Sequence, residues 1–203
     1  MAIWKKLPKI NINSEMCKIV VAYYYRFKNR YLYTCTEYKN FDVCACNGKY
    51  LTEIEVKVSH SDLVADTNKI KMYSWARDEN GKLIRDKNGK KVKVNIKLKH
   101  DFYSGKCKSK YIIVPNYFYY CLSEDLCLDG KSVKWIEEHY PNYGIMWIRD
   151  WREPIIIKRP TMLNKNKVGQ NILDDILKRI SSENIGLKKR LYDLKESIKK
   201  ESQ

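Results

Sequence analysis

Two carboxylates and an amine lie close together in the stretch from residue 51 to residue 72, which reads LTEIEVKVSHSDLVADTNKIKM. Its first residues alternate between apolar and charged side chains, a pattern typical of a β-strand. Because the side chains of a strand alternate between its two faces, Glu53, Glu55 and Lys57 share one face. A solvated strand face would show the same alternation, so a function requires a further acidic group on that face.

Asp42 supplies such a group. The run FDVCAC at residues 41 to 46 is a second strand candidate, and the Asn47-Gly48 pair after it is a strong signal for a hairpin turn. With a turn of three or four residues, Asp42 falls close to opposite Glu55 across the ladder, where Cβ atoms are about 5 Å apart. We therefore expect Asp42 and Glu55 to be able to share one metal ion.

The set of Asp42, Glu55 and Lys57 suits hydrolysis of a phosphodiester. That reaction needs a divalent cation on hard oxygen ligands, a nucleophilic water, and a positive group near the attacking or leaving oxygen. Mg²⁺, or Mn²⁺ in its place, fits a carboxylate site that keeps several waters and takes a substrate phosphate as a ligand. The carbonyl of Val56 could supply one further oxygen, and Lys57 would orient or deprotonate the water.

The composition indicates a folded protein with an acidic partner. Hydrophobic residues make up 44% of the 203 residues, no stretch is long enough to span a bilayer, and the N-terminal lead lacks the apolar segment of a secretory signal. Lysine and arginine number 40 against 24 Asp and Glu, a net charge of +16 that favours nucleic acid. A coding bias toward lysine would give the same excess.

The cysteines favour a reducing compartment. They number seven, and none forms a CxxC pair, so neither a disulfide framework nor a standard zinc site is indicated. Cys44 and Cys46 are expected to be small buried residues of a strand. We expect a protein of the cytoplasm, or of the host-cell cytoplasm if a phage encodes it.

The elements that would position the charged residues follow an α/β order. A helix is expected from residue 14 to about residue 28, with a buried stripe of Met16, Ile19, Val20, Tyr23 and Phe27. Glu15 lies at the edge of that stripe, where it could equally serve to stabilise the helix N-terminus. The other expected elements are strands at 31–36, 41–46, 51–58, 111–115, 143–148 and, at an edge, 153–157, and helices at 61–72 and from 122 or 132 to 139.

Two appendages are expected. Residues 77 to 98 hold two Asn-Gly pairs in a near-duplicate D-x-N-G-K and predict an inserted basic β-hairpin, either a phosphate-contacting arm or a solvated surface hairpin. Beyond Pro160, Leu and Ile recur at helical spacing with a break near Gly186, which predicts two amphipathic helices. These helices could pack on the domain, pair with another copy to give a homo-oligomer, or fray.

Together these residues resemble a known superfamily. Asp42 on one strand, Glu55-Val56-Lys57 on the next, and a helical Glu15 upstream resemble the PD-(D/E)xK nucleases. The longer string EIEVKVSHSDLVAD, with Lys99-His100 and the runs at 111–115 and 143–145, is similar to the MmcB-like DNA-repair branch and related phage proteins. The resemblance covers most of residues 14 to 150.

The resemblance implies a restriction-endonuclease-like mixed sheet flanked by helices over residues 1–160, with residues 161–203 as a C-terminal helical tail. It implies a Mg²⁺-dependent deoxyribonuclease of DNA repair, replication or phage DNA processing. Asp42 and Glu55 would be metal ligands, Lys57 the catalytic lysine, and Glu15 an assistant acting through a water. The DNA cleft would be lined by Asp62, Asp66, Lys69, Lys99, His100 and Tyr103.

Two alternatives of other classes remain open at this point. One is a non-catalytic basic nucleic-acid-binding or phage assembly protein built on a nuclease-like fold. The other is a structural component joined through its C-terminal helices, whose oligomers would be lost on truncation at about Pro160. His100 taken alone is more typical of a surface or hydrogen-bonded core histidine than of a catalytic base.

Overall fold

A computed structural model of the chain describes residues 12–201, without the side chains at 195, 196 and 198–201. The N-terminal lead and the side chain of Ile198 therefore lie outside the described part. The chain divides into two compact units, a sheet unit formed by the residues up to Val58 and from Asn116 onward, and a hairpin unit, Ser59–Pro115. Among the described residues, none of the helices has the length and apolar character needed to cross a membrane.

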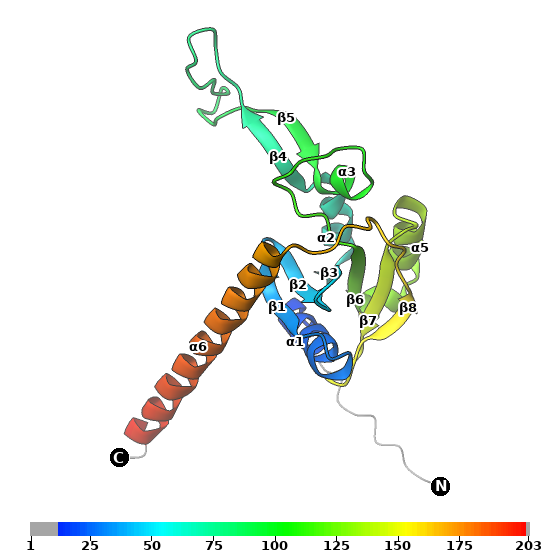
Figure 1. The fold of residues 1–203 in the computed structure, drawn as a ribbon, viewed down its shortest axis with the longest axis vertical. Helices are drawn as coiled ribbons and strands as arrows, with labels where there is room; N and C mark the ends of the chain where they lie inside the picture. Colours follow the sequence, from blue (N-terminus) through cyan, green and yellow to red (C-terminus); the bar gives the residue numbers. More distant parts are fainter. Residues whose placement is uncertain (1–11, 202–203) are drawn as a thin grey trace. The chain divides into compact units, whose positions relative to one another are not determined.

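The sheet unit is built on a six-stranded mixed sheet in the order β1-β2-β3-β6-β7-β8 (Figure 1). The first three strands form an antiparallel meander, β6 and β7 run parallel to β3, and β8 closes the edge in the antiparallel sense. The predicted α/β class and mixed sheet are confirmed. The strands are β1 (Tyr33–Tyr38), β2 (Phe41–Cys46), β3 (Leu51–Lys57), β6 (Tyr117–Ser123), β7 (Gly144–Ile148) and β8 (Ile155–Lys158).

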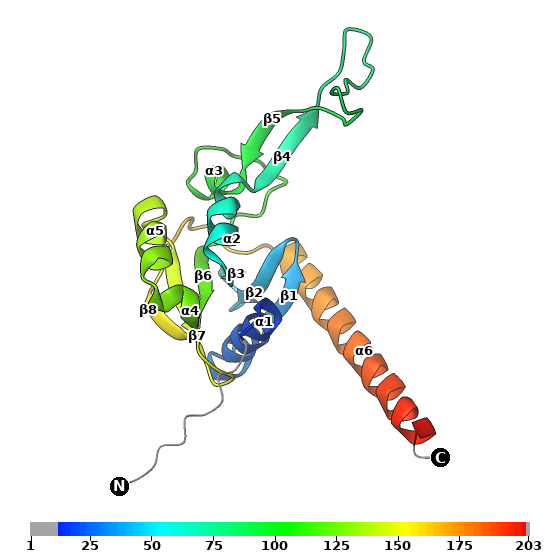
Figure 2. The same cartoon turned by 180° about the vertical axis from the view of Figure 1, so that it is seen from behind.

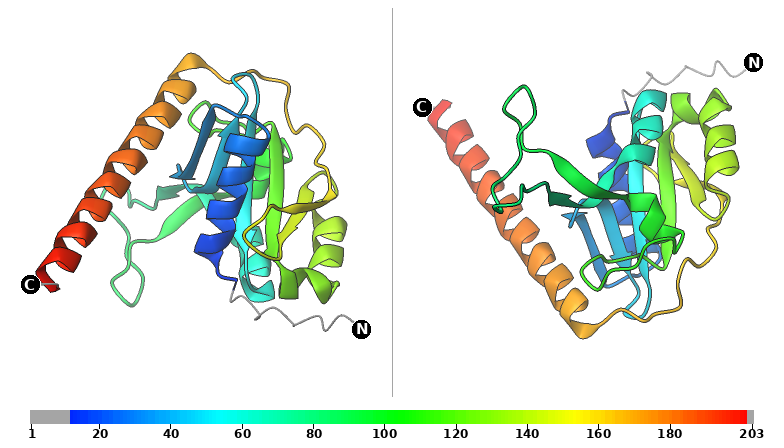
Figure 3. Two further views of the ribbon diagram at one scale, coloured as in Figure 1. Left: turned by 90° about the horizontal axis from the view of Figure 1, so that it is seen from below. Right: turned by 90° about the horizontal axis from the view of Figure 1, so that it is seen from above.

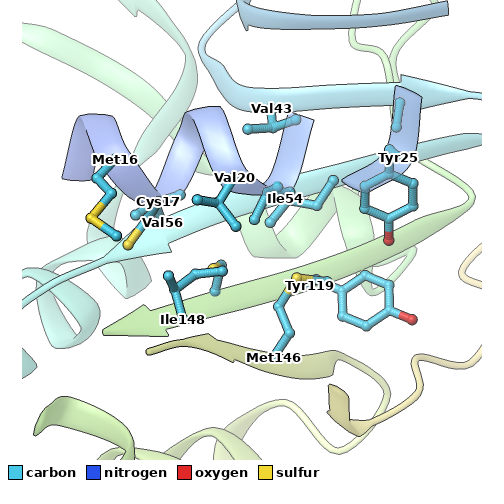
Figure 4. Packing of buried hydrophobic residues seen from close by; sticks show 13 residues of the cluster. Met16, Cys17, Val20, Tyr25, Val43, Ile54, Val56, Tyr119, Met146 and Ile148 are labelled. Atoms are coloured by element: carbon cyan, nitrogen blue, oxygen red, sulfur yellow. The ribbon is translucent and has the colours of Figure 1, made fainter. Parts of the chain in front are cut away.

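Helix α1 (Ser14–Tyr23) covers one face of this sheet and continues into a short π-helix, η1 (Tyr24–Lys28). Asn13 begins the helix, because its side chain accepts a hydrogen bond from the backbone N–H of Met16 at 2.8 Å. Figure 4 shows the apolar side of α1 packed on the inward residues of the central strands. The core there is made by Met16, Cys17, Val20, Val21, Tyr25, Val43, Ala45, Ile54, Val56, Tyr119, Cys121, Met146 and Ile148.

The predicted stripe of this helix is wrong in part. Met16 and Val20 are buried as predicted, but Ile19, Tyr23 and Phe27 are exposed. Ile19, Val20 and Val21 are all apolar, so helical spacing alone cannot decide whether the buried stripe includes Ile19 or Val21. The π-helix then rotates the residues that follow, and Tyr25 is the aromatic side chain of that turn that reaches the core.

The strand that pairs with β3 on its parallel side is not the one the sequence indicated. Residues 111 to 115 form no strand, and Tyr111 is exposed; the central strand is β6, the tyrosine-rich run that follows Asn116. Pro115 cannot donate to a ladder, and the chain enters the sheet directly after it. The buried Asn116 fixes this entry, since its N–H donates to the Leu51 carbonyl and its side chain accepts from the Leu51 N–H, both at 2.8 Å.

Two short helices, α4 (Glu124–Leu128) and α5 (Lys131–His139), connect β6 to β7 (Figure 2). The predicted helix end at His139 is confirmed, as are the buried strand predicted at 143–148, which is β7, and the edge strand predicted at 153–157, which is β8. Cys44 and Cys46 are fully buried in β2 as expected, and none of the seven cysteines forms a disulfide.

The C-terminal segment is one helix, α6 (Gln170–Glu201), and the predicted break at Gly186 is wrong (Figure 3). A glycine costs only about 1 kcal/mol in a helix, and strong helix formers surround this one. The first turns of α6 dock on β1 through the buried Leu173 and Ile176. Further along, Thr36 of β1 donates from Oγ1 to Glu183 at 2.8 Å and accepts from Arg179 Nε at 3.1 Å.

The hairpin unit contains a second, two-stranded sheet, β4 paired with β5. Ser59 caps the first helix, accepting from the Asp62 N–H at 3.2 Å. The predicted extension of that helix to Met72 is wrong. Residues 70 to 75, IKMYSW, have the β-branched and aromatic content of a strand and pair with residues 93 to 98. The elements are α2 (His60–Ala65), η2 (Asp66–Asn68), β4 (Ile70–Trp75), β5 (Lys93–Leu98) and α3 (Lys99–Tyr103).

The predicted inserted hairpin is confirmed in kind, with a stem that begins at Ile70 and two turns at its tip. In the first turn Asp78 Oδ1 accepts from the Asn80 and Lys82 N–H groups, and Asp86 does the same in the second turn eight residues later. Arg77 and Arg85 each donate to the glycine carbonyl of their own turn. The glycines have positive φ, at Gly81 (+77°) and Gly89 (+75°), which explains the repeated Asn-Gly pairs.

Candidate active site

Strand pairing brings Asp42 and Glu55 together as predicted. In the β2–β3 ladder Val43 lies opposite Ile54, so Asp42 and Glu55 are the next pair of residues along the two strands. Asp42 is further tied to β3 because its Oδ2 accepts a hydrogen bond from the Val56 N–H at 2.8 Å. The Asn47-Gly48 turn sets this register, with Gly48 at a φ of +89°.

The charged face of β3 is buried, so its interpretation as an ordinary solvated face is wrong. Glu53, Glu55 and Lys57 are 0%, 3% and 4% exposed. Lys57 Nζ lies 3.2 Å from Glu55 Oε1 on the same strand. Charges removed from water cost several kcal/mol each unless they are paired, so a strand that keeps three of them is typical of a functional site.

Lys18 of α1 is a site residue that the sequence did not reveal. Its ammonium lies 3.2 Å from Asp42 Oδ1 and also donates to Glu37 of β1. The predicted Glu15, one turn earlier, is an exposed residue of the first turn of α1. No spacing rule links Lys18 to Asp42, because their contact depends on how the helix lies across β1 and β2.

Burial, and to a smaller extent a second carboxylate, disfavour the ionised form of Asp42. Burial and the neighbouring Glu55 raise the pKa of the Asp42 carboxyl, and the Val56 N–H and Lys18 only partly offset this. Burial lowers the pKa of Lys18, but Glu37 and Asp42 outweigh it and hold that pKa above its usual range. A divalent cation between Asp42 and Glu55 would relieve the repulsion between the two carboxylates.

The donor set at this place fits a magnesium ion that keeps part of its water. Among the described residues, no three His, Cys, Asp or Glu side chains gather at one point. Asp42 and Glu55 therefore offer two carboxylates, and the Val56 carbonyl, water and a substrate phosphate would complete an octahedron. That composition is usual for Mg²⁺ and unlike a closed structural zinc site.

The residues predicted to line a DNA cleft belong to the hairpin unit, and most of them surround Asp66. His100 Nε2 lies 2.9 Å from Asp66 Oδ2, and the ammonium groups of Lys69 and Lys99 each lie 3.7 Å from an oxygen of Asp66. The Tyr103 ring meets His100 edge-on. Lys99 and Asp66 are buried, so this network holds η2 and α3 together, and His100 is a hydrogen-bonded buried histidine. Asp62 lies exposed in the first turn of α2.

The hairpin unit also concentrates positive charge. Between residues 59 and 115 there are fourteen Lys and Arg against six Asp and Glu. On the stem, Lys93 lies over the ring of Tyr73 at 4.4 Å and Lys91 over Trp75 at 5.6 Å, and both rings are partly exposed. Exposed aromatic rings with adjacent lysines are the combination that binds the bases and phosphates of nucleic acids.

Comparison with known proteins gives no further constraint: no family model, no curated protein and no solved structure matches this chain.

Proposed function

We propose that the protein is a metal-dependent nuclease that hydrolyses DNA phosphodiester bonds, on a restriction-endonuclease-like sheet, in DNA repair, replication or phage DNA processing. The observation that carries this proposal is the position of Asp42 beside Glu55. The Val56 N–H holds Asp42 there, and Lys57 lies on the Glu55 carboxylate. Two acids and a lysine at this spacing supply what phosphodiester hydrolysis requires.

In this proposal Asp42 and Glu55 hold Mg²⁺ or Mn²⁺ with help from the Val56 carbonyl. When bound, such an ion would lower the pKa of a water and neutralise charge on the phosphate. Lys57 keeps its ammonium in a buried position from which it orients the attacking water and compensates the charge that develops on the phosphate oxygens. Burial of this lysine strengthens that interaction relative to one in bulk water.

Lys18 has a different role in the proposal. It neutralises Asp42 in the protein without metal, and its contact with Glu37 gives it a second carboxylate partner. Lys18 can therefore leave Asp42 and still keep an ion pair. Asp42 then becomes available as a ligand without leaving the partly buried Lys18 ammonium unpaired.

DNA is the proposed substrate because of charge. The chain carries a net charge of +16, and the hairpin unit alone has an excess of basic residues with exposed aromatic rings beside them. Phosphate neutralisation by such lysines supplies most of the non-specific affinity for nucleic acid.

The test is cleavage by the purified full chain of single-stranded, duplex and branched DNA, with Mg²⁺, with Mn²⁺ and with a chelator. Lys57→Met is expected to lower the rate at least about 100-fold, the usual effect of removing a group that moves or orients a proton. Asp42→Asn should lose metal dependence together with activity. The control is Lys28→Met, the same change at an exposed lysine of the sheet unit.

Absence of cleavage of every substrate by the folded wild type would overturn the proposal, as would equal cleavage by Lys57→Met and Lys28→Met. A second candidate has its own supporting observation, because Lys18 and Lys57 already neutralise Asp42 and Glu55. The protein would then bind nucleic acid, or serve in phage assembly, without catalysis. Salt-dependent DNA binding that survives Glu55→Gln, with no turnover by the wild type, would favour this second candidate.

A further inference from the structure

Helix α6 carries a heptad repeat in addition to the residues that dock it on β1. Apolar residues recur along it at alternating steps of three and four, with a single polar interruption at Asn184. A strict 3.5-residue period is the pattern of a coiled-coil seam, narrower than the apolar stripe of an ordinary surface helix. The seam consists of Leu177, Ile180, Asn184, Leu187, Leu191, Leu194 and, by its place in the sequence, Ile198.

The seam lies exposed beyond the point where α6 leaves β1. The contacts with β1 end at Glu183, and every residue from 184 to 194 is exposed. Leu187, Leu191 and Leu194 are 56%, 57% and 57% exposed. Scattered exposed leucines need no explanation, but a contiguous seam of them on one helix face marks an interaction surface. The same helix face that docks on β1 continues into the seam, because Ile176, Ile180, Glu183 and Leu187 follow one another at helical spacing.

We propose that this seam binds the α6 helix of a second copy of the chain, in parallel and in register, as a two-stranded coiled coil. The partner must carry the same 3.5-residue period, and a second α6 always does. Asn184 decides the orientation. In a parallel, in-register pair the two Asn184 amides face each other and hydrogen-bond, which is the usual role of a polar residue at an a position. In an antiparallel pair centred on the seam, each amide would meet a leucine and lose its hydrogen bonds, which destabilises that orientation.

The charges beside the seam neither favour nor oppose the parallel pair. In the parallel register, Glu183 lies across from Lys188 of the second copy, whereas Arg190 lies across from Lys195, so one flanking pair is attractive and one is repulsive. Exposed ion pairs of this kind contribute little to association. The Asn184 term is larger, and the short seam predicts a dimer with a dissociation constant in the micromolar range.

The first experiment is sedimentation equilibrium of the full chain from about 1 to 200 µM, where micromolar association is visible. The wild type is expected to shift from monomer to dimer. Leu191→Glu should remain monomeric, while Tyr192→Glu should dimerise like the wild type. Tyr192 is the matched control because it is equally exposed on α6 but lies off the seam. Both side chains are exposed in the monomer, so circular dichroism should show an unchanged fold.

The second experiment tests register through position 184. Asn184→Asp and Asn184→Lys should each dimerise at least tenfold more weakly than the wild type, because like charges would face each other. An equimolar mixture of the two variants should recover dimer, since only a parallel, in-register pair places residue 184 opposite itself. A wild type that stays monomeric at about 200 µM, or equal behaviour of Leu191→Glu and Tyr192→Glu, would overturn the dimer. A mixture no tighter than the single variants would overturn the parallel register.

Discussion

At the residue scale, β3 holds charges where a central strand ordinarily holds apolar side chains. Ile54 and Val56 of this strand pack in the core under α1. Glu53, Glu55 and Lys57, which alternate with them along the strand, are buried on its other face. Natural proteins retain such locally unfavourable choices mainly at functional sites. Replacing Glu55 and Lys57 together by apolar residues should therefore raise stability and abolish activity, whereas replacing one of them leaves the other charge buried without its ion-pair partner and lowers both.

Asp42 gives the first prediction, on the pH dependence of stability. Its folded pKa is raised, so the folded state binds the proton more readily than the unfolded state and stability falls as pH rises from about 3.9, the ordinary value for Asp, through the raised one. Asp42→Asn should remove this decline and be at least as stable as the wild type at pH 7 without metal, because an amide oxygen can still accept from the Val56 N–H. Urea unfolding between pH 3 and 8 measures it.

The control for that series is Asp174→Asn, an exposed carboxylate on α6, which should keep the wild-type pH profile. A wild type more stable than Asp42→Asn by more than about 1 kcal/mol at pH 7 would mean that the Lys18 ion pair outweighs burial and Glu55. The account of the Asp42 electrostatics would then be wrong.

Lys18 gives the second prediction, which rests on the proposed metal site. Lys18→Met removes the ammonium that competes for Asp42, so Mn²⁺ affinity measured by calorimetry should rise about threefold to tenfold, the equivalent of an ion pair worth on the order of 1 kcal/mol. Lys28→Met should bind Mn²⁺ like the wild type. Weaker binding by Lys18→Met would instead make Lys18 a supporting residue of the site.

At the element scale, local signals that carry their own geometry were predicted well. The Asn47-Gly48 turn and the β2–β3 register depend on a few adjacent residues, and both are confirmed. Elements whose secondary structure depends on residues distant in the sequence were predicted poorly. The tyrosine run of β6 is a strand because β3 and β7 flank it, and α6 passes through Gly186 because no local breaker outweighs its neighbours.

Two glycines test this difference between elements. A Cβ on Gly144 of β7 would lie 2.4 Å from ring atoms of the buried Tyr119 and 2.8 Å from Pro160 Cδ, so Gly144→Ala should destabilise the protein by about 1–3 kcal/mol. A Cβ on Gly186 would meet nothing within 4 Å, so Gly186→Ala should stabilise α6 by up to about 1 kcal/mol. Thermal unfolding of the two variants measures both effects. Equal shifts in melting temperature for Gly144→Ala and Gly186→Ala would contradict the close packing of Gly144 against Tyr119 and Pro160.

At the scale of the whole molecule, charge was the most predictable property and the arrangement of the site the least. The acids and the lysine of the candidate site were predictable because strand alternation and one turn determine their faces. The contact of Lys18 with Asp42 and the gathering of Lys69, Lys99 and His100 around Asp66 were not, because they depend on tertiary packing. The burial of Glu55 and Lys57 could not be predicted either, because the alternation of apolar and charged residues is the same for a solvated strand face.

The basic hairpin gives a prediction at this scale. Replacing Lys82, Lys87 and Lys90 at its tip by Gln should weaken DNA binding and reduce the slope of log K against log salt by up to about 3, because each phosphate contact contributes about 0.9. The control replaces Lys131, Lys134 and Lys165 by Gln, the same change in charge at exposed lysines of the sheet unit. Fluorescence anisotropy at several salt concentrations measures both slopes. Equal losses of DNA affinity in the two variants would mean that the hairpin lysines contribute only through the net charge of the protein.

A metal ion held by Asp42 and Glu55 underlies the proposed function, and anomalous diffraction from crystals containing Mn²⁺ would locate that ion. The predicted result is an anomalous peak about 2.0–2.2 Å from a carboxylate oxygen of each residue, with Lys18 turned toward Glu37, and no such peak in Asp42→Asn. A folded wild type with no peak at this pair, or with Lys18 still on Asp42 at saturating Mn²⁺, would contradict the account.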